Sequence, residues 1–107
     1  MAKAIYSNRG ESIEFLNSTD ATLETGEIVS IGDTRVGVVG AAINAGCIGT
    51  VHVVGVYAMP KGNGAIEQGA ALYYADGTVS ASEGGVPCGW AESAANESAA
   101  TVRVKIG

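Results

Sequence analysis

Residues 46–61 read GCIGTVHVVGVYAMPK and form the longest run of β-branched and apolar residues in the chain. The run closes at Pro60, and proline cannot donate a backbone hydrogen bond to a sheet ladder. In an extended conformation alternate residues point to opposite sides, and both sides of this run are largely apolar. We therefore predict one central strand here, either covered on both sides within its own domain or packed by one face against a second subunit.

Shorter β-prone segments flank this run, and turn residues separate them. The sequence predicts strands at residues 12–16, 35–39, 86–91 and 101–106, and a strand pair or bulged strand around the break at Gly26. Asp76-Gly77 lies between two β-prone runs and predicts a type I′ hairpin, because both residues tolerate positive φ.

The spacing of these segments is typical of an all-β, mostly antiparallel protein. We expect a small barrel or sandwich with at most one or two short helical turns. Residues 1–107 are expected to form a single domain with residues 1–10 as an N-terminal arm, and neither a domain boundary nor an internal repeat is evident.

The composition of the 107-residue chain favours self-association. One Trp, four Tyr and one Phe are available to fill a core, while sixteen glycines raise the entropic cost of ordering the backbone. Burial of apolar strand faces between subunits adds stability that so small a monomer supplies only weakly.

Charge and hydropathy argue against two classes of partner, nucleic acids and membranes. The formal net charge is −5 and the six basic residues are scattered, so no basic patch for a phosphate backbone is visible. No apolar run approaches the roughly 20 residues of a membrane span. The N-terminus lacks the apolar core of a signal peptide, so we expect synthesis in a cytoplasm, with Cys47 and Cys88 reduced.

The residues also argue against catalysis. Cys47 and His52 are the only candidates for a Cys/His pair, and their odd separation puts them on opposite faces of a regular strand. The eleven carboxylates are spread along turns and strand edges, as on a solvated surface. We expect no catalytic residue, no cofactor and no zinc site, with a calcium site built from turn oxygens left open.

Several segments together resemble a family of small proteins of tailed bacteriophages and prophages. That family was formerly catalogued as a domain of unknown function and is now associated with capsid cement, or decoration, proteins. Some members carry a predicted-recombinase label, which the acidic charge and the missing phosphate-binding loop contradict. The similar segments are residues 26–32 (GEIVSIG), 36–39 (VGVV), 45–46 (AG), 55–61 (GVYAMPK), 69–74 (GAALYY), 77–80 (GTVS) and 100–106 (ATVRVKI).

The resemblance implies a structural protein of the virion. Such a protein binds the major capsid protein on the outer surface of the expanded head shell, typically as a homotrimer, and clamps neighbouring capsid subunits. Two hypotheses follow for this chain. The arm orders on the shell by strand addition, and residues of the central strand line the subunit interface. The proposed capsid contacts are Lys3, Ala4, Ile5, Tyr6 and Arg9, and the proposed interface residues are Val54 and Val56.

Other interpretations remain open. In the simplest alternative, the arm is a frayed terminus that binds nothing, and the central strand is an ordinary core strand that lines no interface. The chain is alternatively a low-copy virion protein of the head-completion or tail-associated kind. A small hydrolase built around Cys47 or converging carboxylates is a third possibility, and a nucleic-acid binder fits least well.

Overall fold

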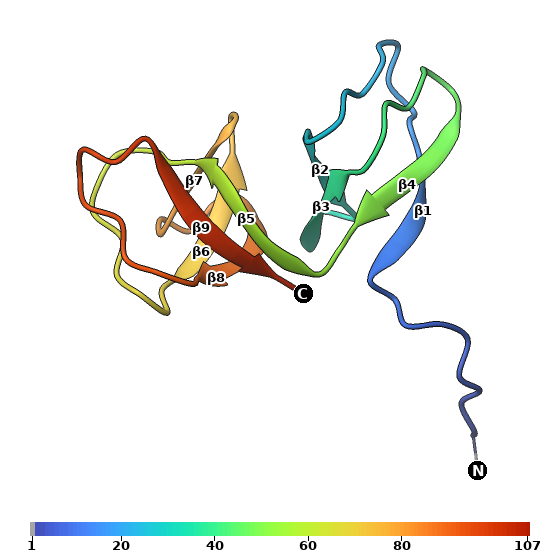
Figure 1. Ribbon diagram of the computed structural model, residues 1–107, viewed down its shortest axis with the longest axis horizontal. Coiled ribbons are helices and arrows are strands. Elements are labelled where there is room, and N and C mark those ends of the chain that lie inside the picture. Colours follow the sequence, from blue (N-terminus) through green and yellow to red (C-terminus); the bar gives the residue numbers. More distant parts are fainter. Residues whose placement is uncertain (1) are drawn as a thin grey trace.

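The computed structural model describes residues 2–107, and within that range it contains strands, turns and bends but no helix. The strands form two antiparallel sheets, ordered β1-β4-β3-β2 and β5-β9-β8-β6-β7 (Figure 1). The sheets do not close into a barrel, so the all-β prediction is confirmed in its sandwich form. The strands are β1 (Ser12–Leu16), β2 (Ile28–Ile31), β3 (Arg35–Val39), β4 (Ile48–His52), β5 (Gly55–Pro60), β6 (Ala71–Ala75), β7 (Thr78–Ser80), β8 (Val86–Ala91) and β9 (Thr101–Ile106).

The single central strand predicted over residues 46–61 is wrong. The run forms β4 and β5, which belong to different sheets: β4 pairs with β1 and β3, whereas β5 pairs with β9. The strands are separated at Val53 and Val54, and Gly55 follows with φ 132°, a conformation that favours glycine. β-branched residues favour strands on both sides of this point, so the pattern alone does not reveal that the chain changes sheets.

Other local predictions are confirmed. The strands at residues 12–16, 35–39, 86–91 and 101–106 have the predicted bounds. Asp76 and Gly77 have φ values of 51° and 82°, as the type I′ hairpin between β6 and β7 requires.

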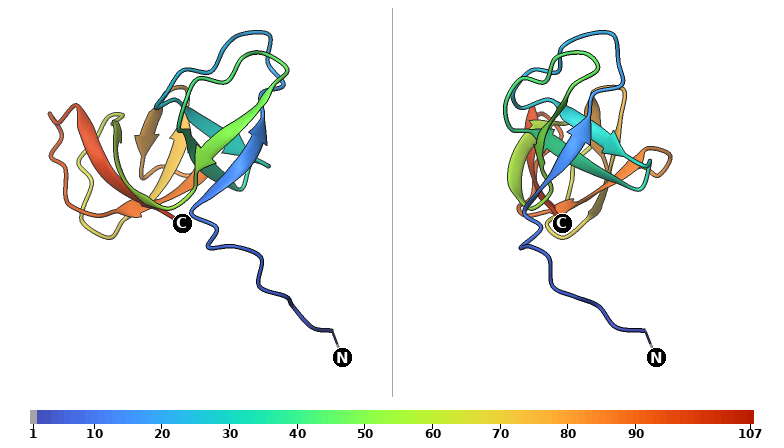
Figure 2. Two further views of the ribbon diagram at one scale, coloured as in Figure 1. Left: turned by 45° about the vertical axis from the view of Figure 1, so that its right-hand side comes forward. Right: turned by 90° about the vertical axis from the view of Figure 1, so that its right-hand side faces the viewer.

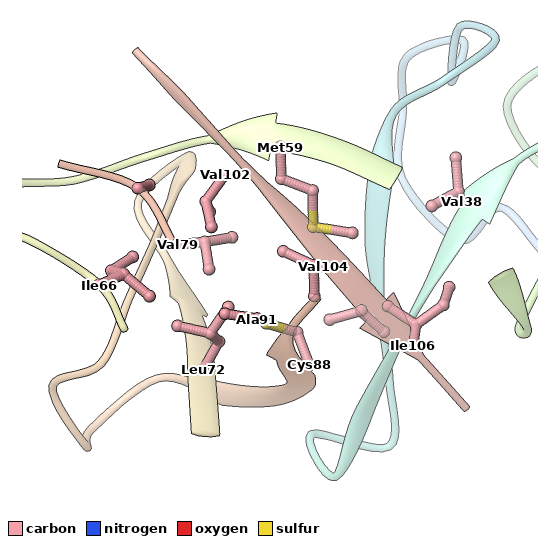
Figure 3. Packing of buried hydrophobic residues seen from close by; sticks show 12 residues of the cluster. Val38, Met59, Ile66, Leu72, Val79, Cys88, Ala91, Val102, Val104 and Ile106 are labelled. Carbon is pink, nitrogen blue, oxygen red and sulfur yellow. The ribbon is translucent and has the colours of Figure 1, made fainter. Parts of the chain in front are cut away.

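Strand β3 joins the two sheets through its alternating side chains. Val36 and Val38 lie in the larger apolar cluster, which is built mostly from the five-stranded sheet (Figure 3). Val39, on the opposite face of β3, belongs to a smaller cluster with Val51 and Ile43. The four-stranded sheet therefore buries part of each face, one against the second sheet and one against its own loops.

Four similar turns connect the strands. In each, an apolar residue in an isolated β-bridge precedes a turn closed by a backbone hydrogen bond between residues three apart. The bridges pair the turns in two sets, Leu23 with Ile43 and Ile66 with Ala95. The N–H donors are Glu27, Cys47, Ala70 and Ala99, and their acceptors are the carbonyl groups of Glu24, Asn44, Glu67 and Asn96, at 3.0–3.1 Å.

Candidate functional site

The N-terminal arm is the most exposed segment that the structure describes. Residues 2–10 contain no strand and lead away from both sheets (Figures 1 and 2). Ile5 and Tyr6 are 92% and 78% exposed, which is unusual for large apolar side chains. The five predicted capsid contacts thus lie on one accessible segment, whereas Met1 lies outside the described residues.

The arm also differs from the rest of the chain in charge. Lys3 and Arg9 are its only charged residues, so residues 2–10 carry +2, and the remaining four basic and eleven acidic residues give −7. Arg9 forms an ion pair with Glu11 at 3.0 Å, but both side chains are largely exposed. Such a pair contributes no more than about 1 kcal/mol and leaves the arm free to bind elsewhere.

The predicted interface residues Val54 and Val56 are exposed, at 41% and 40%. Strand β5 is an edge strand of its sheet. The Lys61 N–H donates to the Ala100 carbonyl at 2.9 Å, which sets the ladder so that the odd-numbered residues of β5 bond to β9. The backbone groups of Val56 and Ala58 consequently point to the open edge, where another strand can pair with them.

Trp90 extends this exposed surface across the sheet, and sequence reasoning missed it. Val56 lies opposite Lys105, Lys105 lies opposite Trp90, and Trp90 lies opposite Ala71. Trp90 is 47% exposed although it lies two residues from the buried Cys88. A shift in the β6–β8 register makes Cys88 an extra residue and turns Trp90 outward. Gly89 in the middle of a predicted strand is the sequence signal of such a bulge.

We call this outer surface of the five-stranded sheet the Trp90 face. Both of its basic side chains bond to groups of the same chain. Arg103 forms an ion pair with Glu92 at 3.0 Å, and the Lys105 ammonium donates to the carbonyls of Ile106 and Gly107 at 3.2 and 3.4 Å. Two basic residues and one acidic residue give the face a net charge of +1. The face comprises Val56, Ala58, Ala71, Trp90, Glu92, Arg103 and Lys105.

A second exposed apolar surface lies on the four-stranded sheet. Leu16 and Ile48 pair directly across β1 and β4 and are 54% and 65% exposed. Glu14 lies on the same side, two residues along β1, and is the only acidic residue among its neighbours there. We call this surface the Leu16–Ile48 face. It comprises Ser12, Glu14, Leu16, Ile48, Thr50 and His52, all exposed.

The candidate catalytic residues do not converge. Cys47 is exposed and precedes β4, whereas His52 ends it with its ring close to Gly40. A cavity of about 370 Å³ beside His52 is lined by Tyr57 and by backbone and apolar groups, and neither cysteine nor any carboxylate of residues 2–107 lines it. Burial raises the pKa of the Cys88 thiol from 9.0 to about 11, which disfavours the reactive thiolate.

Residues 2–107 also lack the features of two further classes of site. This part of the chain contains no group of three or more His, Cys, Asp and Glu residues that could hold a metal ion. It also contains no helix long and apolar enough to cross a membrane.

Comparison with known proteins gives one match. A family model described as phage cement protein matches residues 7–106, nearly the whole chain. Neither the curated proteins nor the solved structures gave a match. The matched range includes both sheets, the Trp90 face, the Leu16–Ile48 face and the last part of the arm.

Proposed function

The chain belongs to the phage cement protein family, and we propose that it decorates the outer surface of the expanded head shell and stabilises it by binding the major capsid protein. The family match over residues 7–106 carries this proposal, and it confirms the resemblance seen in the sequence. The family implies a structural role associated with the phage capsid. Cys47 precedes β4 and His52 ends it, so the strand separates the candidate Cys/His pair, which supports a non-enzymatic role.

The arm is the proposed capsid-binding element. It is exposed and contains no strand, so its backbone N–H and C=O groups are available to add to a sheet edge of a capsid subunit, apart from the Gly10 N–H, which donates to Asn8 Oδ1 at 2.9 Å. Ile5 and Tyr6 supply apolar area for such a contact. Lys3 and Arg9 supply positive charge on an otherwise acidic protein, and Ala4 completes the proposed contact set.

Self-association is the second part of the proposal. A trimer placed at or near a three-fold position of the shell contacts several capsid subunits at once, and the joint contacts raise the affinity above that of one arm. Val54 and Val56 are the proposed interface residues. Their exposure and the open edge of β5 support this role, since apolar strand surface left in water favours association.

A low-copy virion role is the alternative within the same structural class. A head-completion or tail-associated protein binds at a few positions, whereas a decoration protein repeats with the lattice. Binding to purified shells tests the proposal. Undecorated expanded shells are mixed with the purified protein and pelleted, and we expect saturation at a ratio that approaches the number of capsid subunits. Absence of the protein from the pellet, or saturation at a few copies per shell, would contradict the proposal.

A further inference from the structure

The two exposed apolar faces of the chain differ in charge. The Trp90 face carries Arg103 and Lys105 against Glu92, a net charge of +1. The Leu16–Ile48 face carries Glu14 alone, a net charge of −1 with His52 neutral. Each face presents large apolar side chains to solvent: Val56 and Trp90 are 40% and 47% exposed, and Leu16 and Ile48 are 54% and 65% exposed.

We propose that the Trp90 face of one copy packs against the Leu16–Ile48 face of the next copy. This inference rests on the self-association in the proposed function and names the surfaces that carry it. In this contact Trp90 and Val56 bury apolar area against Leu16 and Ile48, and Glu14 of one copy approaches the basic groups of the other.

Charge decides between this contact and a symmetric one. Packing the Trp90 face against itself would bring Arg103 and Lys105 of two copies together. Packing the Leu16–Ile48 face against itself would oppose two Glu14 carboxylates. Like charges across an interface cost free energy, whereas the mixed contact pairs opposite charges in a chain whose overall charge of −5 disfavours association.

The mixed contact also determines the kind of assembly. A contact between two different surfaces is heterologous, and heterologous contacts close into rings when the rotation between copies allows it. A ring of three is the trimer of the proposed function. Val56 is part of this contact. Val54 lies at the border of the contact, because it is next to Gly107, whose carbonyl accepts from the Lys105 ammonium.

The single tryptophan makes the contact measurable. Because Trp90 is the only tryptophan of the chain, its fluorescence emission reports burial of this face without a label. On dilution from an assembled state, sedimentation should show dissociation to monomers, and the emission should shift to longer wavelength over the same concentration range. A wild-type protein that stays monomeric, or an oligomer whose Trp90 is as accessible to acrylamide as in the monomer, would overturn the inference.

Charge reversal tests the pairing of the two faces. Glu14→Lys and Lys105→Glu should each weaken association by about tenfold, and the double variant should recover most of the loss, because the opposite charges then face each other again. Glu83→Lys, on the exposed turn between β7 and β8 and outside the residues of both faces, is the matched control and should not change association. A double variant that is no better than the single variants would contradict the inference.

A variant that removes apolar area at an exposed position tests the contact without a charge reversal that could disturb the fold. Ile48→Thr keeps a β-branched residue on an exposed strand position and should weaken association by about tenfold while circular dichroism remains unchanged. Unchanged association in this variant would count against the inference. Pelleting with shells separates this inference from capsid binding: monomers that still bind shells would refute self-association and the contact described here, but not the binding of the protein to the shell.

Discussion

Gly89 lies so close to the backbone of Lys105 that a β-carbon at Gly89 would overlap the carbonyl oxygen of Lys105. Its φ of 133° also lies in a region that side chains rarely adopt. This close approach belongs to the bulge that buries Cys88 and turns Trp90 to the outer face. One glycine therefore positions the tryptophan of the proposed subunit contact.

Substitution of this glycine should unfold the bulge or displace β9. We expect Gly89→Ala to lower the free energy of unfolding by about 2–4 kcal/mol, because the new methyl group meets backbone that cannot rotate away. Urea denaturation of the purified protein measures the change. Gly62→Ala is the control, since its β-carbon would meet Thr78 Oγ1 at 3.3 Å and no backbone atom closer than 3.7 Å. Equal stability of Gly89→Ala and wild type would refute the close approach.

Asn17 connects β1 to the first pair of repeated turns. Its side chain is fully buried; Nδ2 donates to the carbonyls of Ala21 and Ile43 at 2.8 and 2.9 Å, and Oδ1 accepts from Thr19. Asn17→Ala removes these hydrogen bonds and leaves the Thr19 N–H without its acceptor, although the Ile43 and Ala21 carbonyls still accept from Leu23 N–H and Thr19 Oγ1. The lost bonds should cost about 2–3 kcal/mol of unfolding free energy. The same substitution at Asn8, which is exposed on the arm, should change the midpoint of urea unfolding little. A loss at Asn17 no larger than the loss at Asn8 would count against this network.

The two cysteines should differ in reactivity. Cys47 is exposed, whereas Cys88 is buried and its thiol has a pKa raised by burial to about 11. Iodoacetamide at pH 8 should therefore modify only Cys47 in the folded protein and both residues in urea, as peptide mass spectrometry reports. Rapid modification of Cys88 in the folded protein would contradict its burial.

The same pKa shift predicts a pH dependence of stability. The thiol of the unfolded chain ionises near 9.0, but the folded protein holds the proton until about pH 11. Between these values the unfolded state binds fewer protons, so the free energy of unfolding should fall as pH rises, by up to roughly 1.4 kcal/mol per pH unit. Cys88→Ala should remove this decline, which urea titrations at pH 8, 9 and 10 would show. An equal decline in wild type and variant would assign it to other groups.

The arm should affect shell binding and not folding. Residues 2–9 contribute no strand and no buried side chain, so their deletion should leave the free energy of unfolding within about 0.5 kcal/mol of wild type. The protein that lacks residues 2–9 should fail to pellet with expanded shells. Ile5→Ser with Tyr6→Ser should reproduce most of the loss, whereas Ser7→Ala is a control on the same segment. Full binding by the deleted protein would remove the arm from the proposed function.

Prediction from the sequence succeeded where the structural signal is local. Alternation in residues 101–106 and the Asp76-Gly77 pair predicted β9 and the hairpin, because strand and turn propensities act over a few residues. It failed where distant contacts decide. Residues 46–61 are largely apolar on both sides, so only the pairing of β4 with β1 and of β5 with β9 reveals the change of sheet.

The candidate site was predicted in the same uneven way. The turn residues at 7–10 predicted an N-terminal arm, and the structure shows the named arm residues exposed. Their contact with the capsid stays a prediction. The central run predicts Val56 as an interface residue, but the sequence does not predict that Trp90 is exposed. Regular alternation cannot tell which face of the sheet a residue occupies after a bulge. Leu16 and Ile48 were missed since their contact depends on the β1–β4 register, which links residues far apart in the chain.

The central claim is that this protein repeats over the surface of a phage head. The copy number in purified particles, measured by mass spectrometry against the major capsid protein, tests it most directly. Closed symmetry links copy number to lattice positions, so we predict roughly one copy for each capsid subunit. A handful of copies per particle would move the protein to a head or tail vertex, and its absence from the particle would contradict the account.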